Sequence, residues 1–262
     1  MRKSLKNVCN LLSDIQGEIS VEQSFLNDLK RSIELSDEKQ RRLPSKAYHP
    51  SSMNCIRNMY YQRVGVKPTD NSSSYVLTGI CNSGSDIHER IQQAVIDMQS
   101  NSIDCEYVDV AEYVRARNLT HINIVSKQGY ETKLYDTNLN TSFLCDGIIK
   151  YKNHYYILEL KTESIYKWQS RQGVDPSHFN QATAYSISLQ LPEVIFVYIN
   201  RDLLDMKSFL YVPTDSQKRD LKRVIEQCEE YVNTKETPSK PENVPKKACE
   251  YCNYKSLCRK EG

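Results

Sequence analysis

Residues 143–161 most restrict what this chain can fold into, because two apolar runs there flank one short polar stretch. The pattern predicts an antiparallel β-hairpin. If Lys152 and Asn153 form a two-residue loop, the register places Asp146 directly opposite Glu159. Opposed residues have Cβ atoms about 4.5–5.5 Å apart, so both carboxylates would be close enough to touch one cation. A loop one residue longer would shift the register and separate them.

Side chains alternate along a strand, so the second half of the hairpin would carry a polar pair and an apolar pair on opposite faces. Glu159 and Lys161 would point to one face, and Leu158 and Leu160 to the other. Two carboxylates held close together are costly unless a cation joins them, and Mg²⁺ suits them because it takes oxygen ligands. Lys161 could then steady the attacking water or the charge on a phosphate. The alternative is an amphipathic hairpin with a surface salt bridge between Glu159 and Lys161.

Length, composition and charge limit the class of protein. The chain has 262 residues, 39% of them hydrophobic, which suits one large domain or two small ones. The formal net charge is +2, so any surface for nucleic acid would have to be local. No run reaches the ~18 apolar residues of a membrane span, and we expect neither a membrane segment nor a signal peptide. Nine cysteines without a secretion signal favour a reducing compartment, the cytoplasm.

The chain divides into three predicted parts. Residues 1–45 are polar and helix-prone, and we expect a helical appendage. Residues 46–234 would form the core, and residues 235–262 a Pro- and Lys-rich linker with a cysteine tail. Within the core, residues 67–82 are rich in Ser, Asn and Asp, which predicts a loop, and a helix would open at Gly84.

Two predicted helices carry further polar candidates. On the helix that opens at Gly84, His88 shares a face with apolar residues, where an interior histidine with satisfied hydrogen bonds is the simplest explanation. A second helix follows Pro176, and on it Gln181 and Tyr185 lie about one turn apart beside the buried stripe. An amide and a phenol there could contact phosphate or stack on a base, although a polar helix shoulder is the alternative.

The tail contains Cys249, Cys252 and Cys258, and the Cys-x₂-Cys spacing lets two thiolates reach one metal centre. Three soft ligands need a fourth. No histidine lies nearby in the sequence, and Cys55 is the candidate. Four thiolates fit either a [4Fe-4S] cluster or Zn²⁺.

Asp146, Glu159 and Lys161, in this order, resemble the core motif of the PD-(D/E)XK nuclease superfamily. Cys145 stands where the motif has proline, a departure that is usual in the RecB-like branch. The resemblance implies an α/β fold: a restriction-endonuclease-like core with a central mixed β-sheet flanked by helices. It also implies that Asp146, Glu159 and the Leu160 carbonyl bind Mg²⁺ or Mn²⁺, and that Lys161 positions the hydrolytic water.

Further positions extend the resemblance to the RecB-like branch. Gly84 and His88 resemble its helix-start motif, which implies that His88 is a metal ligand. Gln181 and Tyr185 match its Gln-x-x-x-Tyr motif, which implies that they organise the site and touch DNA. The strand-turn-strand before the aspartate also resembles the branch, and Glu131 in it is a weaker site candidate that could equally be an exposed strand residue.

The cysteine pattern resembles the iron–sulfur members of this branch, which include CRISPR-associated adaptation exonucleases and AddB nuclease domains. They place one cysteine before the nuclease core and three after it, as Cys55 and then Cys249, Cys252 and Cys258 are placed. The resemblance therefore implies a [4Fe-4S] cluster that joins the two ends of the chain as a structural end piece. A zinc staple is the alternative.

The function that this resemblance implies is a metal-dependent DNA nuclease, an exonuclease on single-stranded DNA or DNA ends, in a bacterial, archaeal or phage-infected cell. No Gly-x₄-Gly-Lys-Ser/Thr motif occurs, so a helicase motor would be a separate chain. A recombination or CRISPR partner and a second copy of the chain are the other partners such a function allows. The alternative is a non-catalytic DNA-binding or assembly module with the same fold, which would suit a nearly neutral chain.

Overall fold

The computed structural model describes residues 20–40, 46–70, 74–242, 244, 246–250 and 252–261. These residues belong to two compact units, of which the smaller comprises Met1–Arg42 and Ser72–Cys81 and the larger the rest of the chain. The predicted N-terminal appendage is helical in its described part, as helix α2 (Val21–Gln40); residues 1–19 and 41–45 lie outside the described residues.

The smaller unit pairs α2 with the first turns of α4 (Tyr75–Ser100). The backbone N–H of Tyr75 donates a hydrogen bond to Glu34 Oε1 at 3.2 Å. The ammonium of Lys30 lies over the Tyr75 ring, 5.0 Å from its centroid. These polar contacts join the two helical segments within the unit.

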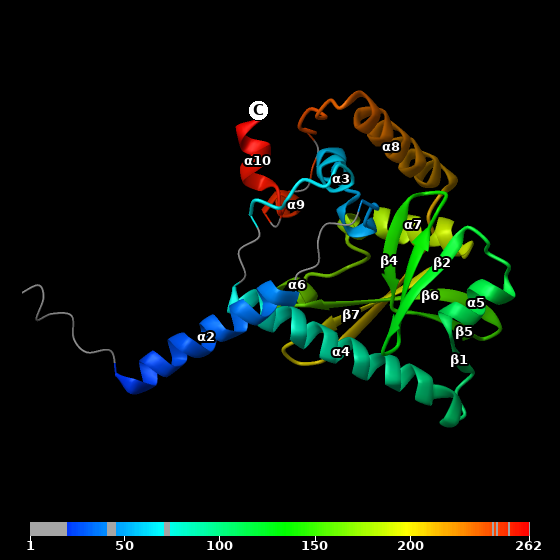
Figure 1. Ribbon diagram of the computed structural model, residues 1–262. Coiled ribbons are helices and arrows are strands. Elements are labelled where there is room, and N and C mark those ends of the chain that lie inside the picture. Colours follow the sequence, from blue (N-terminus) through cyan, green and yellow to red (C-terminus); the bar gives the residue numbers. More distant parts are fainter. Residues whose placement is uncertain are drawn as a thin grey trace, which may run out of the picture. The chain divides into compact units, whose positions relative to one another are not determined.

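The larger unit is built on a five-stranded mixed sheet in the order β1-β5-β6-β7-β8 (Figure 1). β6 and β7 are parallel, and the other neighbouring strands are antiparallel. The predicted α/β class with a central mixed sheet is therefore confirmed. The bounds are β1 (Cys105–Val108), β5 (Gly147–Tyr151), β6 (His154–Glu163), β7 (Val194–Asn200) and β8 (Met206–Tyr211).

The hairpin between β5 and β6 has the predicted register. Its pairs run from Tyr151 and His154 at the turn to Gly147 and Leu158 at the open end. The two turn residues, Lys152 and Asn153, both have positive φ angles, 48° and 66°, as a two-residue turn that matches the strand twist requires. The loop length on which the sequence argument depended is confirmed.

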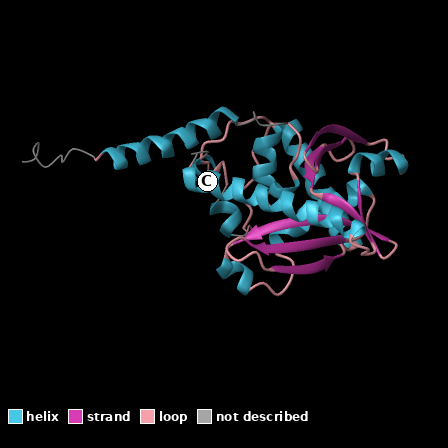
Figure 2. Cartoon of the chain, turned by 90° about the horizontal axis from the view of Figure 1, so that it is seen from below, coloured by secondary structure: helices cyan, strands magenta, loops and turns pink. Residues whose placement is uncertain are grey.

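Helices cover both faces of this sheet, and in Figure 1 the strands β6 and β7 run between α7 and α4. On one face, Tyr185 of α7 (Phe179–Leu189) packs in the same core as Ile157. On the other face, Ile87 of α4 packs with Leu160. The helices are cyan and the strands magenta in Figure 2. Because both faces are covered, the middle of β6 and most of β7 are buried, whereas the edge strand β8 is half exposed.

The helix α4 begins at Tyr75, so the prediction of a loop up to residue 82 and a helix start at Gly84 is wrong. Gly84 lies inside the helix, where it faces β6. A Cβ on Gly84 would lie 3.1 Å from Thr162 Oγ1. The glycine therefore allows the helix to lie close to the strand. The helix start was missed because the first turns of α4 contain polar residues between their apolar positions.

A second, three-stranded antiparallel sheet in the order β2-β3-β4 precedes the hairpin. It consists of β2 (Ile122–Gln128), β3 (Glu131–Asp136) and β4 (Thr141–Cys145), and α5 (Val110–Ala116) leads into it. β4 ends one residue before Asp146. The last strand of the second sheet is therefore followed almost directly by the hairpin.

The C-terminal part of the larger unit returns to the region of α3 (Ile56–Arg63), and Figure 1 shows α9 and α10 beside α3. Tyr254 is fully buried, and its ring centroid lies 5.1 Å from that of Tyr61 in α3. No helix among the described residues is long and apolar enough to cross a membrane. The remaining elements are η1 (Pro50–Ser52), α6 (Ile165–Gln169), η2 (Pro176–His178), α8 (Asp215–Thr234), α9 (Lys246–Glu250) and α10 (Lys255–Lys260).

Candidate active site

Asp146 lies just beyond the last residue pair of the β5–β6 hairpin and continues its hydrogen bonding through the side chain. Its Oδ2 accepts a hydrogen bond from the backbone N–H of Leu160 at 2.7 Å. The N–H and C=O of one strand residue point to the same side, so the Leu160 carbonyl also points toward Asp146. The register thus brings an aspartate carboxylate and a backbone carbonyl together at the open end of the hairpin.

Glu159 and Lys161 share one face of β6, as alternation predicts. Lys161 Nζ donates a hydrogen bond to Glu159 Oε1 at 2.5 Å. Leu158 and Leu160 lie in the core on the opposite face, with Ile87 of α4. The predicted division of the strand into a polar and an apolar face is confirmed, and the pair is not a surface salt bridge because Glu159 is buried.

Gln181 joins α7 to this acid–lysine pair. Its Nε2 donates to Glu159 Oε1 at 2.8 Å, and its Oε1 accepts from Lys161 Nζ at 3.1 Å. One amide therefore holds both the Glu159 carboxylate and the Lys161 ammonium. The buried amide cannot serve as a polar helix shoulder in solvent.

Tyr185 supports Gln181 from one turn further along α7. Its hydroxyl accepts from Gln181 Nε2 at 2.9 Å and donates to the carbonyl of Leu144 at 3.0 Å. Its ring stacks on Phe143, with centroids 4.8 Å apart. Because the hydroxyl is engaged and the side chain is buried, this geometry gives Tyr185 a positioning role between α7 and β4.

A second group of possible ligands surrounds Asp146. One ligand atom from each of His88, Glu131 and Asp146 lies within 4.8 Å of the others. His88 Nδ1 is 3.9 Å from Asp146 Oδ1. The structure therefore places Glu131, the weaker candidate from sequence, beside the two stronger ones.

The pairing of β3 with β4 explains the position of Glu131. Thr132 pairs with Cys145, so the preceding residue of β3 comes alongside the residue that follows β4. Antiparallel neighbours of this kind have side chains close enough to share one ligand. The position of Glu131 beside Asp146 could have been predicted only if the length of the turn between β3 and β4 were known, and the sequence alone did not give it.

Two residues that the sequence did not single out hold the backbone of Asp146. Gln92 Nε2 donates to the Asp146 carbonyl at 2.7 Å. The Tyr107 hydroxyl shares its one hydrogen between this oxygen, at 3.2 Å, and the Tyr130 carbonyl, at 2.9 Å. Gln92 follows Gly84 and His88 at intervals of four residues, so all three lie on one stripe of α4. This spacing could have predicted Gln92 as a member of the site.

The electrostatics of the cluster are dominated by burial. Burial raises the pKa of Asp146 and of Glu159, and the nearby ammonium of Lys161 opposes both shifts. Burial also raises the pKa of Glu131. For Lys161 burial favours a lower pKa, but Glu159 and Asp146 outweigh it, so the pKa of the ammonium is raised and the amine stays charged. Two carboxyl groups, those of Asp146 and Glu159, thus act on one ammonium.

The surroundings of His88 favour the neutral form of its imidazole. Burial lowers its pKa, and the charge of Lys161 lowers it further. A neutral imidazole has a nitrogen lone pair to offer a metal, whereas imidazolium does not. The protonation state of His88 therefore agrees with a ligand role.

A divalent cation fits this donor set. Glu159 Oε2 is buried and has no hydrogen-bond partner among the described residues. A buried carboxylate oxygen left without a partner is costly, and a cation would supply the missing interaction. Carboxylate and carbonyl oxygens with one imidazole suit a hard ion such as Mg²⁺ or Mn²⁺.

The four cysteines singled out in the sequence influence one another's pKa. Burial raises the pKa of the Cys55 thiol, and Cys249 and Cys258 add to the shift. Burial likewise raises the pKa of Cys252, with contributions from the other three. Cys55 precedes α3 while the others lie in or between α9 and α10, so the two ends of the larger unit meet here.

Two N–H groups point at these sulfur atoms. Arg57 Nη1 donates to Cys258 Sγ at 3.4 Å, and the backbone N–H of Tyr254 donates to Cys252 Sγ at 3.4 Å. Such donors stabilise thiolates and accompany cysteine ligands of iron–sulfur and zinc centres. Four cysteine thiols are the donor set of a zinc site as well as of an iron–sulfur cluster, so the residues alone do not select between the two.

Comparison with known proteins gives no family assignment. No model of a known protein family matches the sequence, and no curated protein matches it. Among solved structures, the crystal structure of SSO0001 is similar to this chain with a TM-score of 0.47 and 15% sequence identity. The alignment covers 89% of this chain and 96% of that one. The α/β class and the candidate metal site follow from the chain's own strands, helices and side chains.

Proposed function

We propose that this chain is a metal-dependent DNA nuclease of the RecB-like branch of the PD-(D/E)XK superfamily. It would act as an exonuclease on single-stranded DNA or DNA ends. One observation carries the proposal: Asp146, Glu159 and Lys161 converge at the open end of one hairpin, and Glu159 Oε2 is buried without a partner among the described residues. An amphipathic surface hairpin would not require this arrangement.

The residues that would hold the cation are Asp146, Glu159, His88 and the Leu160 carbonyl, and Glu131 joins them through its place beside His88 and Asp146. When bound, Mg²⁺ or Mn²⁺ supplies a Lewis acid for the scissile phosphate and lowers the pKa of a bound water. The acids also make the site selective for hard cations, because oxygen donors predominate.

Lys161 would act as a charged hydrogen-bond donor. Its raised pKa keeps the ammonium protonated, so it is unsuited to remove a proton from water. Glu159 and Gln181 hold Nζ from two sides, which leaves the remaining N–H free for a water or a phosphate oxygen. Its charge then stabilises the negative charge that grows on the phosphate.

The finer architecture belongs to the same proposal. The mixed sheet with α4 and α7 on its two faces would be a restriction-endonuclease-like core. Cys55, Cys249, Cys252 and Cys258 would hold a [4Fe-4S] cluster that joins both ends of the larger unit as a structural end piece. The protein would work in the cytoplasm, with a separate helicase or a recombination or CRISPR partner, or with a second copy of itself.

The nuclease proposal is tested with full-length protein and end-labelled single-stranded oligonucleotides in Mg²⁺, Mn²⁺ or chelator. We expect Mg²⁺- or Mn²⁺-dependent cleavage that falls about 100-fold or more in Glu159→Ala and Lys161→Ala. Lys222→Ala, which removes an exposed lysine from α8, is the matched control and should keep full activity. Labels at either end give the polarity.

Activity that survives both substitutions would refute the site. DNA binding without cleavage under any metal would indicate the non-catalytic module instead. Circular dichroism and thermal unfolding of each variant separate loss of chemistry from loss of fold.

The end piece is tested on protein purified without oxygen. A brown colour, iron in the purified protein and loss of both in Cys252→Ser would support the cluster, and Cys81→Ser, which changes an exposed cysteine elsewhere, should keep them. Colourless protein that contains zinc would overturn the cluster in favour of a zinc staple.

A further inference from the structure

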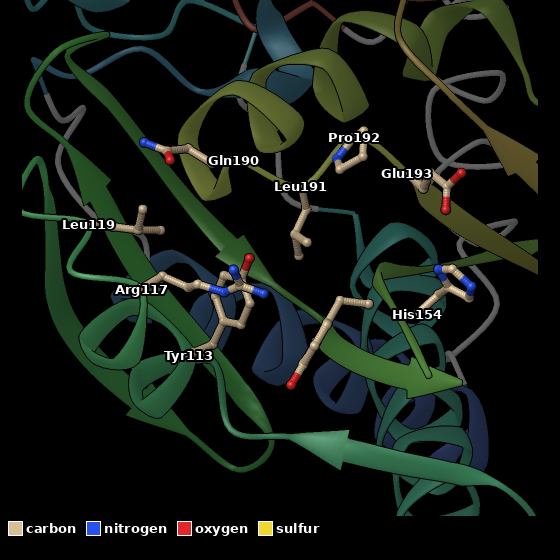
Figure 3. A pocket seen from close by; sticks show the side chains of 9 residues that line it. Tyr113, Arg117, Leu119, His154, Gln190, Leu191, Pro192 and Glu193 are labelled. Atoms are coloured by element: carbon tan, nitrogen blue, oxygen red, sulfur yellow. The ribbon is translucent and has the colours of Figure 1, made fainter. Parts of the chain in front are cut away.

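A cavity of about 510 Å³ opens at the C-terminal end of α7, at the other end of that helix from Gln181 (Figure 3). Its wall includes Arg117 and Tyr113 from the end of α5, Tyr155 from β6, and Gln190 and Leu191 from the turn after α7. The volume lies in the range of about 300–1,000 Å³ that is typical of small-molecule sites. The cavity takes no part in the acid–lysine site.

Arg117 is the most informative residue of this wall. Its guanidinium carbon lies 5.6 Å from the centroid of the Tyr113 ring and 5.5 Å from that of Tyr155. The centroids of the two rings lie 5.9 Å apart. The guanidinium lies over the faces of both rings, which attract a cation. The guanidinium is thereby oriented by contacts that use none of its N–H groups.

The donors of Arg117 remain available. Within the described part of the chain, its guanidinium makes no hydrogen bond and no ion pair, although the side chain lines the cavity. A planar guanidinium held in one orientation with free N–H groups is suited to bind an anionic oxygen pair, such as phosphate. The two rings favour one orientation of the guanidinium, which lowers the side-chain entropy lost on binding.

The rest of the wall fits an organic body joined to that anion. Leu119 and Leu191 are buried side chains that provide an apolar surface. His154 and Glu193 lie on the side of the cavity opposite Arg117 in Figure 3. A carboxylate accepts hydrogen bonds from hydroxyl and amino groups, so this side suits a sugar or a base and disfavours a second anion. The cavity therefore has the cationic Arg117 on one side and the anionic Glu193 on the other.

We propose that this cavity binds a nucleotide, with its phosphate on Arg117 and its sugar and base toward Leu191 and Glu193. The cavity is separate from the acid–lysine site: Tyr155 precedes Glu159 by four residues on β6, about 13 Å along the strand. Ile157 is completely buried between them. One mononucleotide cannot touch both places, and the inference does not depend on nuclease activity.

The test is isothermal titration calorimetry of full-length protein without divalent metal, with deoxyadenosine monophosphate as the probe. We expect saturable binding that Arg117→Ala weakens by about tenfold or more, the effect of losing charge-assisted hydrogen bonds. Arg115→Ala removes the other exposed arginine of the same helix region and should leave the affinity unchanged.

Three further probes define the ligand. Inorganic phosphate and deoxyadenosine should each bind at least about tenfold more weakly than the nucleotide, since each lacks one half of the contacts. A 5′-phosphorylated oligonucleotide distinguishes a free nucleotide from the end of a strand. Binding of either kind that depends on Arg117 supports the proposal. Equal affinity for phosphate and nucleotide overturns it.

Hydrogen exchange locates the bound nucleotide independently of any substitution. We expect the nucleotide to slow exchange in residues 190–193 and around Arg117. Three outcomes would refute the assignment: no binding, binding that Arg117→Ala leaves unchanged, or protection confined to residues 144–161. Arg117→Lys, which keeps the charge without the planar fork, should bind more weakly than the wild type.

Discussion

Gly84 of α4 and Thr162 of β6 approach each other so closely that a Cβ on the glycine would lie 3.1 Å from Thr162 Oγ1. This approach sets the distance between the helix and the strand. His88 follows Gly84 by one turn, and its Nδ1 lies 3.9 Å from Asp146 Oδ1. The spacing of the helix from the sheet therefore determines whether the imidazole can share a ligand with the aspartate.

Substitution of this glycine should displace His88. In Gly84→Val the larger side chain has to push α4 away from β6, so we expect lower thermal stability and about tenfold or greater loss of Mn²⁺ affinity. Gly79→Val is the control, because no atom lies within 4 Å of a Cβ at that position of the same helix. Calorimetric titration with Mn²⁺ measures the affinity. Equal effects of the two substitutions would contradict this explanation.

The unpartnered oxygen of Glu159 predicts stabilisation by a cation. Mn²⁺ at about 100 times its dissociation constant should raise the unfolding free energy of the wild type by about 3 kcal/mol. Glu159→Gln should abolish most of that gain, whereas Glu106→Gln, an exposed position on β1, should keep it. Thermal unfolding with and without metal measures the difference. An undiminished metal effect in Glu159→Gln would exclude this carboxylate as a ligand.

Glu131 should contribute to cation binding although the sequence gave it little weight. Glu131→Gln keeps the size of the side chain but removes its charge, so we expect a fall in Mn²⁺ affinity of about tenfold with the fold preserved. Titration of the variant beside the wild type checks this. An unchanged dissociation constant would mean that the side chain lies near the site without binding the ion.

Tyr185 should act on the site through Gln181. Tyr185→Phe removes a buried hydroxyl and leaves Gln181 Nε2 and the Leu144 carbonyl each without one partner. We expect a loss of about 1–3 kcal/mol in the free energy of unfolding. In a cleavage assay kcat should fall more than KM rises, because the hydroxyl is engaged by Gln181 and the Leu144 carbonyl and acts by positioning the site. Tyr166→Phe, at a side chain that is 83% exposed, should change neither.

His178 should make the protein sensitive to acid. Burial lowers the pKa of this imidazole to about 3, and its Nδ1 lies 2.9 Å from the Tyr198 hydroxyl. Below about pH 6.5 the His178 imidazole binds a proton in the unfolded chain but not in the folded chain. The free energy of unfolding therefore falls as the pH falls. The charged groups that act on the ring are Lys161, Asp175, Lys167 and Arg171.

The substitution His178→Asn isolates this effect from that of the acids. The stability advantage of the wild type over the variant should shrink by on the order of 2 kcal/mol between pH 6.5 and pH 4.5. Urea unfolding of both proteins at several pH values measures it. A difference that stays constant with pH would show that the imidazole titrates normally in the folded protein.

Short-range patterns in the sequence predicted the centre of the site. Alternation along one strand and the length of one turn were enough to bring Asp146, Glu159 and Lys161 together, because both depend only on neighbouring residues. The interval of four residues between Gln181 and Tyr185 worked for the same reason. These features follow from the geometry of a single strand or helix.

Long-range contacts were harder to predict. Glu131 reaches Asp146 through the pairing of two other strands, and its position depends on a loop whose length the sequence does not define. The start of α4 was missed because the polar stretch before Gly84 predicted a loop and Gly84 a helix start, whereas Gly84 lies inside the helix and contacts Thr162, a residue far along the chain. Such roles depend on tertiary contacts, which override local propensity.

The connection between β5 and β6 consists of two residues whose side chains take no part in the site. Adding or deleting a single residue there would turn every following side chain of β6 to the other face of the sheet. The leucines would then replace the acid and the lysine beside Gln181. Among homologues of this protein, an insertion or deletion should therefore be rarer at this tight connection than at any neighbouring loop.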